Sequence, residues 1–136
     1  MGRVVHFEIH AENPERAMAF YGAVFGWEFR KFGQFDYWTI ATGKDGQGID
    51  GGLTRRRGHN PPPASTAPLS SFVCVIDVAD IDKAIAAALA AGGTEALPKN
   101  AIPGVGWSAY FKDPEANLFG IFQALPRQPS GGSSHA

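Results

Sequence analysis

Apolar and polar residues alternate along the first segment of the chain, which is the period of a β-strand with one covered face. The alternation runs over residues 3–10 and predicts a strand there. The two faces of this strand are an apolar face of Val5, Phe7 and Ile9 and a polar face of His6, Glu8 and His10.

The pattern then changes to the period of an amphipathic helix. Asn13 suits the N-cap of this helix, Pro14 suits its first position, and Gly26 ends it. The apolar stripe, at spacings of three and four residues, is Ala17, Phe20, Tyr21 and Val24. Glycines separate three short stretches after the helix, which predict strands near residues 27–32, 35–42 and 48–55.

The same order of elements returns in the second half of the chain. SFVCVIDV at residues 71–78 predicts a strand, Asp80 suits a helix N-cap, and Gly92 and Gly93 end that helix. The helix stripe is Ile81, Ala84, Ile85, Ala88 and Leu89, and the strands after it are predicted near 94–98, 105–112 and 117–123. Each half is small for a core of its own, so the two should pack together. The pattern therefore predicts an α+β fold of two βαβββ modules packed into one unit.

The two modules are expected at residues 1–57 and 71–125, within a single domain of 1–125. Three consecutive prolines lie between them, in residues 58–70, and favour a stiff, extended linker. The small, polar residues 126–136 predict a disordered tail.

Charge and cysteine content narrow the choice of partners. The 136 residues include 12 Lys and Arg against 13 Asp and Glu, a formal net charge of −1, so nothing favours a nucleic acid or an anionic membrane. No apolar run is long enough to span a bilayer. The single cysteine, Cys74, has no internal disulfide partner and favours a cytoplasmic location. Its position between two valines predicts a buried packing thiol.

Three segments resemble the vicinal oxygen chelate superfamily, which includes glyoxalase I, extradiol dioxygenases and the fosfomycin and bleomycin resistance proteins. They are ENPERAMAFYGAVFGWEF at 12–29, VADIDKAIAAALAAGG at 78–93 and GVGWSAYFKDPEANLFGIFQ at 104–123. The resemblance implies that the two modules form a curved mixed sheet around a cleft, with the helices outside, and that the protein is a homodimer. It leaves the activity open, because this fold hosts lyases, isomerases, dioxygenases and binding proteins. One departure is Ala116, where relatives usually have glycine.

The resemblance also implies four strand positions for the ligands of a divalent metal. They fall on His6, near Gly51, at about Val73 and on Gly120, so one ligand of four is present. No carboxylate occurs in residues 117–123 and no histidine in 71–78, whereas such a site needs nitrogen and oxygen ligands from several strands. No cofactor is therefore expected. A Zn, Ni, Mn or Fe ion held by His6 is the alternative.

The polar face of the first strand remains as a candidate binding wall. A carboxylate in an apolar cleft must be paired or carry a raised pKa, so Glu8 is expected to have a partner there. Strand aromatics beside it suit an apolar or flat ligand. The predicted ligand-binding residues are His6, Glu8, His10, Trp38, Gly51, Val73, Trp107, Leu118, Gly120 and Phe122. The basic run Arg55–Arg57 is interpreted as a solvated rim, with an anion-binding role at the mouth of the pocket as the alternative.

Two classes of function follow from these observations. The first is a metal-free protein of the glyoxalase and bleomycin-resistance type that binds a small apolar or aromatic molecule. The second is an enzyme, which is either a glyoxalase-like lyase, isomerase or dioxygenase with a metal at His6, or a metal-free catalyst with Glu8 as general base. The missing ligands favour the binding protein.

Overall fold

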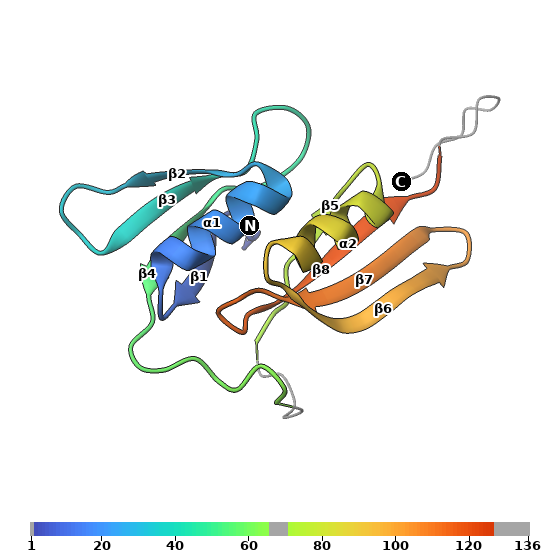
Figure 1. Cartoon of the computed structure of the whole chain (residues 1–136). Coiled ribbons are helices and arrows are strands. Elements are labelled where there is room, and N and C mark those ends of the chain that lie inside the picture. The colour runs from blue at the N-terminus through green and yellow to red at the C-terminus, as the bar shows by residue number, and fades with distance from the viewer. Residues whose placement is uncertain (1, 66–70, 127–136) are drawn as a thin grey trace.

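Two four-stranded sheets, each with one helix, make up the computed structural model, which describes residues 2–65 and 71–126 (Figure 1). The first half of the chain contains β1 (Phe7–Ala11), α1 (Pro14–Phe25), β2 (Glu28–Lys31), β3 (Tyr37–Ala41) and β4 (Gly51–Arg55). The second half contains β5 (Val75–Asp77), α2 (Ile81–Ala90), β6 (Thr94–Ile102), β7 (Gly106–Lys112) and β8 (Leu118–Ala124).

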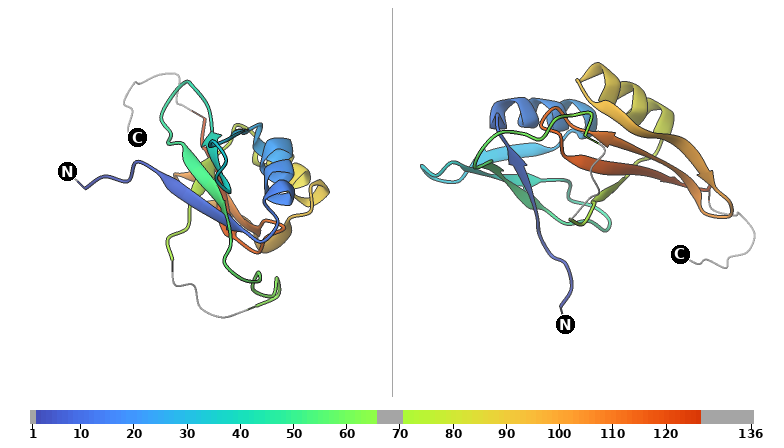
Figure 2. Two further views of the ribbon diagram at one scale, coloured as in Figure 1. Left: turned by 90° about the vertical axis from the view of Figure 1, so that its left-hand side faces the viewer. Right: turned by 90° about the horizontal axis from the view of Figure 1, so that it is seen from below.

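The two sheets have the same topology. The strand order is β1-β4-β3-β2 in the first sheet and β5-β8-β7-β6 in the second. In each, the first and last strands of the half pair in parallel and the other pairs are antiparallel. Both helices lie on the same side of the sheets (Figure 2). The predicted α+β fold of two βαβββ modules with outside helices is therefore confirmed. The boundaries at residues 57 and 71 stay predictions, and the predicted tail lies, beyond residue 126, outside the described residues.

Both helices begin at the predicted caps. The side chain of Asn13 accepts a hydrogen bond from the Arg16 N–H at 3.1 Å, and the side chain of Asp80 accepts one from the Lys83 N–H at 3.1 Å. These bonds satisfy amide donors that have no partner within the helix. Gly26 caps the end of α1 with a φ of 74°, a left-handed conformation that favours glycine.

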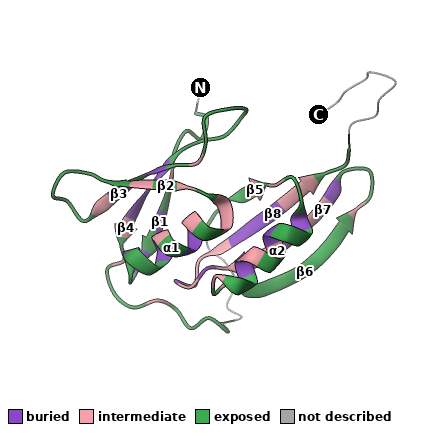
Figure 3. Ribbon diagram, turned by 45° about the horizontal axis from the view of Figure 1, so that its top comes forward, coloured by how far each residue is buried: buried purple, intermediate pink, exposed green. Residues whose placement is uncertain are grey.

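The core lies between the helices and the faces of the sheets that they cover, which we call the helix face of each sheet; the opposite side is the open face. Figure 3 shows the buried positions on the inner sides of the helices and along the central strands. The two helices also contact each other, which joins the core of one half to the other. The largest fully buried apolar side chains are Phe20, Phe111, Ile40, Leu53, Ile81 and Ile121.

Two predicted strands are shorter than their alternation suggested. The first begins at Phe7 instead of residue 3, because its partner β4 begins opposite, at Gly51; Val5, expected on a covered face, is 77% exposed. The segment 71–78 forms a strand only at Val75–Asp77, where it pairs with β8. Cys74 precedes this pairing and is exposed, so the expectation of a buried packing thiol was wrong.

The turn between β7 and β8 is held together by a buried aspartate. Asp113 accepts hydrogen bonds from the backbone N–H groups of Glu115 at 2.8 Å and Asn117 at 2.9 Å. The hydroxyl of Tyr21 on α1 donates to the same carboxylate at 2.6 Å. Burial raises the pKa of Asp113 in spite of these donors, and burial beside this carboxylate raises the pKa of the Tyr21 hydroxyl. The hydrogen bond from Tyr21 ties this turn to the first helix.

Glu115, in the same turn, connects three parts of the chain. Its side chain has no exposed surface, and it accepts hydrogen bonds from the Asn13 N–H at 2.9 Å and the Asn60 side-chain amide at 3.0 Å. The Arg16 guanidinium forms an ion pair with its other oxygen. Burial acts to raise the pKa of Glu115, but these donors together outweigh burial, and the pKa is lowered. The turn therefore fixes the second sheet against the start of α1 and the linker.

Glu115→Gln should lower the free energy of unfolding by about 2 kcal/mol at pH 7, because the amide removes a charge-assisted interaction from a buried site. The folded-state pKa of Glu115 lies below its ordinary value of 4.5. Its stabilising contribution is therefore present above that value and is lost as the pH falls through the folded-state pKa. Urea unfolding from pH 7 to pH 3 should show the gap between wild type and variant closing below about pH 4.5. Glu95→Gln, at an exposed position on β6, is the control; a gap that is constant with pH would contradict the role of the charge.

Ala116 follows Glu115 in a left-handed conformation with a φ of 65°, and is the one non-glycine residue with positive φ among residues 2–65 and 71–126. An alanine in this region costs about 1 kcal/mol. Ala116→Gly should therefore raise the free energy of unfolding by about 0.5 kcal/mol, net of the greater flexibility of glycine in the unfolded chain. Ala86→Gly, at an exposed position within α2, should lower it by about 1 kcal/mol. Thermal unfolding of both variants checks the opposite signs.

Candidate ligand-binding cleft

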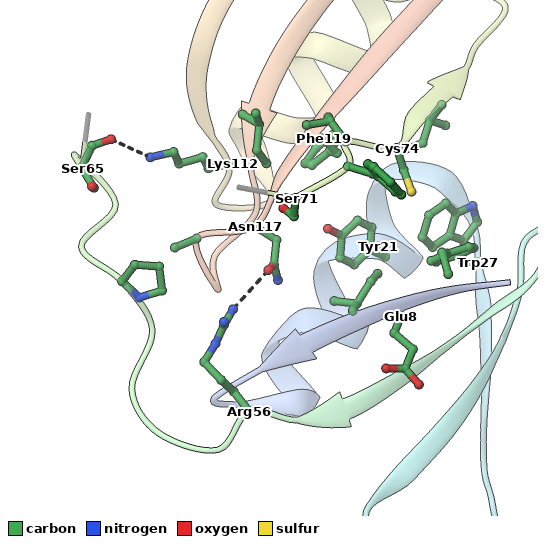
Figure 4. A pocket seen from close by; sticks show the side chains of 18 of the residues that line it. Glu8, Tyr21, Trp27, Arg56, Ser65, Ser71, Cys74, Lys112, Asn117 and Phe119 are labelled. Atoms are coloured by element: carbon green, nitrogen blue, oxygen red, sulfur yellow. Dashed lines mark hydrogen bonds between the residues drawn. The ribbon is translucent and has the colours of Figure 1, made fainter. Parts of the chain in front are cut away.

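A cavity of about 540 Å³ lies where the two sheets meet (Figure 4). β1 is the end strand of the first sheet and β5 is the end strand of the second, and the cavity follows both edges. We call it the junction cleft. Its lining residues are Phe7, Glu8, Ile9, Tyr21, Trp27, Arg56, Pro61, Pro62, Ser65, Ser71, Phe72, Val73, Cys74, Ile76, Lys112, Ala116, Asn117, Leu118 and Phe119.

One wall of the junction cleft is aromatic. The rings of Tyr21 and Trp27 stack with centroids 5.0 Å apart and an interplanar angle of 7°. Phe7 lies 5.7 Å from Trp27, and Phe119 lies 5.9 Å from Tyr21. Since these rings come from β1, the α1 region and β8, the wall forms only when the two halves of the chain are packed together. It offers flat apolar surface to a ligand.

The other end of the cleft is polar. Arg56 Nη2 donates to the side-chain oxygen of Asn117 at 3.1 Å and to the backbone carbonyl of His10 at 2.9 Å. Lys112 Nζ donates to the backbone carbonyls of Pro63 and Ser65 at 2.8 and 3.2 Å. The cleft therefore has an apolar wall and a cationic end.

His6 and Glu8, on the polar face predicted for the first strand, each have a side-chain partner. His6 Nε2 lies 3.2 Å from the Tyr37 hydroxyl, and Glu8 Oε1 lies 3.2 Å from His10 Nε2. The Glu8 and His10 side chains are 48% and 50% exposed. His6 and Glu8 share the open face as predicted, but each contacts another residue. Glu8 borders the junction cleft while its carboxylate points away from Tyr21 and Trp27 (Figure 4).

The strand register identifies which positions of the two halves correspond. Glu8 on β1 pairs with Gly52 on β4, and Val75 on β5 pairs with Gly120 on β8. Gly52, rather than Gly51, therefore shares the open face with Glu8. Val75 on β5 is the counterpart of Glu8 on β1.

Tyrosine rings occupy the space beside both glycines on the open face. A Cβ atom on Gly52 would lie 1.8 Å from the hydroxyl of Tyr37, and a Cβ atom on Gly120 would lie 2.8 Å from the ring of Tyr110. Gly52, Gly120 and the valines of the segment 73–75 supply no side-chain donor, so His6 is the one donor among the four positions implied by the resemblance, and they do not fit the superfamily's metal ion. Within the described part of the chain, no three His, Cys, Asp or Glu side chains converge closely enough to hold one.

The other predicted site residues are divided between the cleft and the core. Val73 and Leu118 line the junction cleft, and Phe122 lies on the open face with Gly120. Trp38 is only 8% exposed and belongs to the core, and Trp107 packs against that core, so neither lies on the open face with Glu8. The sequence did not predict Tyr21, Trp27, Lys112 and Asn117 as lining residues. It offered Arg56 only within the basic run, with anion binding as the alternative. Their signals were an apolar helix stripe, a basic run and the DPEAN turn, each of which has an ordinary structural explanation.

Comparison with known proteins agrees with this architecture. Residues 3–43 match the family model described as bleomycin resistance protein-like N-terminal. A putative glyoxylase of Mycobacterium bovis is 29% identical over 127 residues, which are 93% of this chain and 46% of that protein. The chain thus spans about half the length of this curated relative.

Solved structures show the same fold. A glyoxalase/bleomycin resistance protein/dioxygenase family enzyme from Burkholderia phytofirmans has a TM-score of 0.68 at 22% identity, over 88% of this chain and 97% of that one. A fosfomycin resistance protein from Listeria monocytogenes, solved with Mn(II) and a dihydroxypropylphosphonic acid, has a TM-score of 0.68 at 15% identity, over 90% of each chain. These structures show that the chain has the paired-module fold of the glyoxalase, bleomycin resistance and fosfomycin resistance proteins, so the resemblance seen in the sequence is confirmed at the level of the fold. The described residues form two helices, α1 and α2. Neither of them is long and apolar enough to cross a membrane.

Protein incubated with Zn, Ni, Mn or Fe(II) and then desalted should retain far less than one ion per chain, because the four strand positions offer one side-chain donor. EDTA should leave the unfolding temperature unchanged. Elemental analysis and a thermal scan provide the two measurements. Retention of one ion per chain by the wild type, and its loss in His6→Ala, would show instead that this protein binds a metal ion at His6.

Proposed function

We propose that this protein binds a small apolar or aromatic molecule in the junction cleft without a metal ion. The observation that carries the proposal is the cleft itself. Its volume of about 540 Å³ lies in the range of small-molecule pockets, which combine apolar walls with a few polar groups. The stacked pair of Tyr21 and Trp27 suits a flat ligand.

The strand positions of the metal ligands support the metal-free part of the proposal. The Listeria relative is described with Mn(II), whereas here Gly52 and Gly120 provide no donor and tyrosines fill the space beside them. A bound molecule would therefore be recognised by shape, by aromatic contact and by the polar end of the cleft. The homodimer and the cytoplasmic location stay predictions from the resemblance and the cysteine content, and sedimentation would test the first.

A thermal-shift screen of small aromatic compounds, followed by native mass spectrometry of the hits, tests the proposed function. A ligand present at 100 times its dissociation constant should stabilise the protein by about 2.7 kcal/mol. Val73→Trp should abolish the ligand-induced shift, because Val73 lines the cleft and the larger side chain would fill it.

Val105→Trp is the matched control, since Val105 is 50% exposed and does not line the cleft. It should bind as the wild type does. Hits that bind both tryptophan variants equally would place the ligand elsewhere and contradict the proposal.

A further inference from the structure

The junction cleft contains two cations whose hydrogen-bond acceptors, within the described residues, are all neutral oxygens. Arg56 comes from the segment after β4, and Lys112 ends β7. Both line the cleft, and within residues 2–65 and 71–126 neither forms an ion pair with a carboxylate. This distinguishes Arg56 from its neighbour Arg55, which pairs with Asp36 at the surface.

Hydrogen bonds hold the Arg56 side chain in place, and some of its N–H groups remain available to a ligand. Nε donates to the Asn60 side chain at 3.0 Å, and Nη2 donates to three oxygens, those of the His10 and Glu115 backbone carbonyls and of the Asn117 side chain. Nη1 has no acceptor among the described residues. A guanidinium fixed in this way loses little conformational freedom when a ligand accepts a further hydrogen bond.

Lys112 is similarly oriented by the linker. Two of the three ammonium hydrogens have acceptors, the carbonyls of Pro63 and Ser65. One hydrogen remains for a ligand. Figure 4 shows Asn117 lying on the same side of the cleft as both cations.

The acidic side chains near Arg56 and Lys112 already have partners of their own. Glu115 is paired with Arg16 and receives two further hydrogen bonds, and Asp113 accepts from Tyr21 and from the turn. Glu8 borders the cleft, but its carboxylate contacts His10 and points away from the aromatic wall (Figure 4). The polar end of the cleft is therefore positively charged, with no anion to balance it from the described part of the chain.

We propose that the ligand of the junction cleft is an organic anion, in which a carboxylate or similar oxyanion binds at Arg56 and Lys112 and a flat apolar body lies against Tyr21 and Trp27. This inference rests on the proposed function and specifies the class of molecule bound. Charge-assisted hydrogen bonds to an oxyanion are about twice as strong as those to neutral acceptors. Such a ligand would balance the two charges, while a neutral aromatic molecule would leave them unpaired.

Two fluorescent probes with one ring system test the inference. The anion is 8-anilinonaphthalene-1-sulfonate, and the neutral counterpart is N-phenyl-1-naphthylamine, which lacks the sulfonate. Both should quench the fluorescence of Trp27, and Trp27→Phe should remove that quenching. The wild type should bind the sulfonate at least tenfold more tightly than the neutral probe. Added NaCl should weaken the binding of the sulfonate and leave that of the neutral probe unchanged.

Lys112→Gln should weaken sulfonate binding about tenfold and leave the neutral probe unchanged. Arg56→Gln should act in the same direction, and Arg57→Gln, which lies outside the cleft, is the control. Because Arg56 also supports the fold, the neutral probe serves as an internal check. Damage to the cleft would weaken the binding of both probes, whereas loss of the charge would weaken the binding of the sulfonate alone.

The outcomes separate the two proposals. Equal binding of both probes by wild type and by Lys112→Gln would overturn the anion site and leave the proposed function standing. Failure of both probes to quench Trp27 would overturn the proposed function together with the inference. A sulfonate preference that Arg57→Gln removes and Lys112→Gln does not would place the anion outside the cleft and overturn the inference.

Discussion

A carboxylate with no exposed surface holds the two halves of this protein together. Glu115 accepts hydrogen bonds from the start of α1 and from the linker, and pairs with Arg16. A buried charge persists only when its partners replace water, so these three segments must meet at one place. The neighbouring Asp113 adds the bond from Tyr21. These bonds add to the contact between the two helices, and the edges of β1 and β5 border one cavity, the junction cleft.

The two halves repeat one arrangement on their open faces. In each, a glycine on the last strand lies beneath a tyrosine from the preceding strand, Gly52 with Tyr37 and Gly120 with Tyr110. A residue with a donor side chain at either glycine would have to displace the ring beside it. Both glycines would therefore have to be replaced, each with a shift of its tyrosine, before the two strands offered a side-chain donor at these positions.

The cleft combines groups that are remote along the chain. The aromatic wall is formed by Tyr21 and Trp27 with Phe119, and the cationic end by Arg56 and Lys112. Every one of these residues also has a structural contact, in the core, the linker or the turn. A site built from such residues is already ordered before a ligand arrives, which reduces the entropic cost of binding.

The sequence by itself determined the elements and their order, because the alternation in β1, the stripes of α1 and α2 and their caps at Asn13 and Asp80 are local patterns of period and hydrogen bonding. It also indicated the special position of Ala116, whose φ is 65°. Local patterns cannot show register, since a shift of one residue moves every side chain to the other face. For that reason Trp38 was assigned to a pocket although it lies in the core. Only the tertiary structure decided which cations met at the cleft, because the contacts that bring Arg56 and Lys112 there join segments about 50 residues or more apart in the chain.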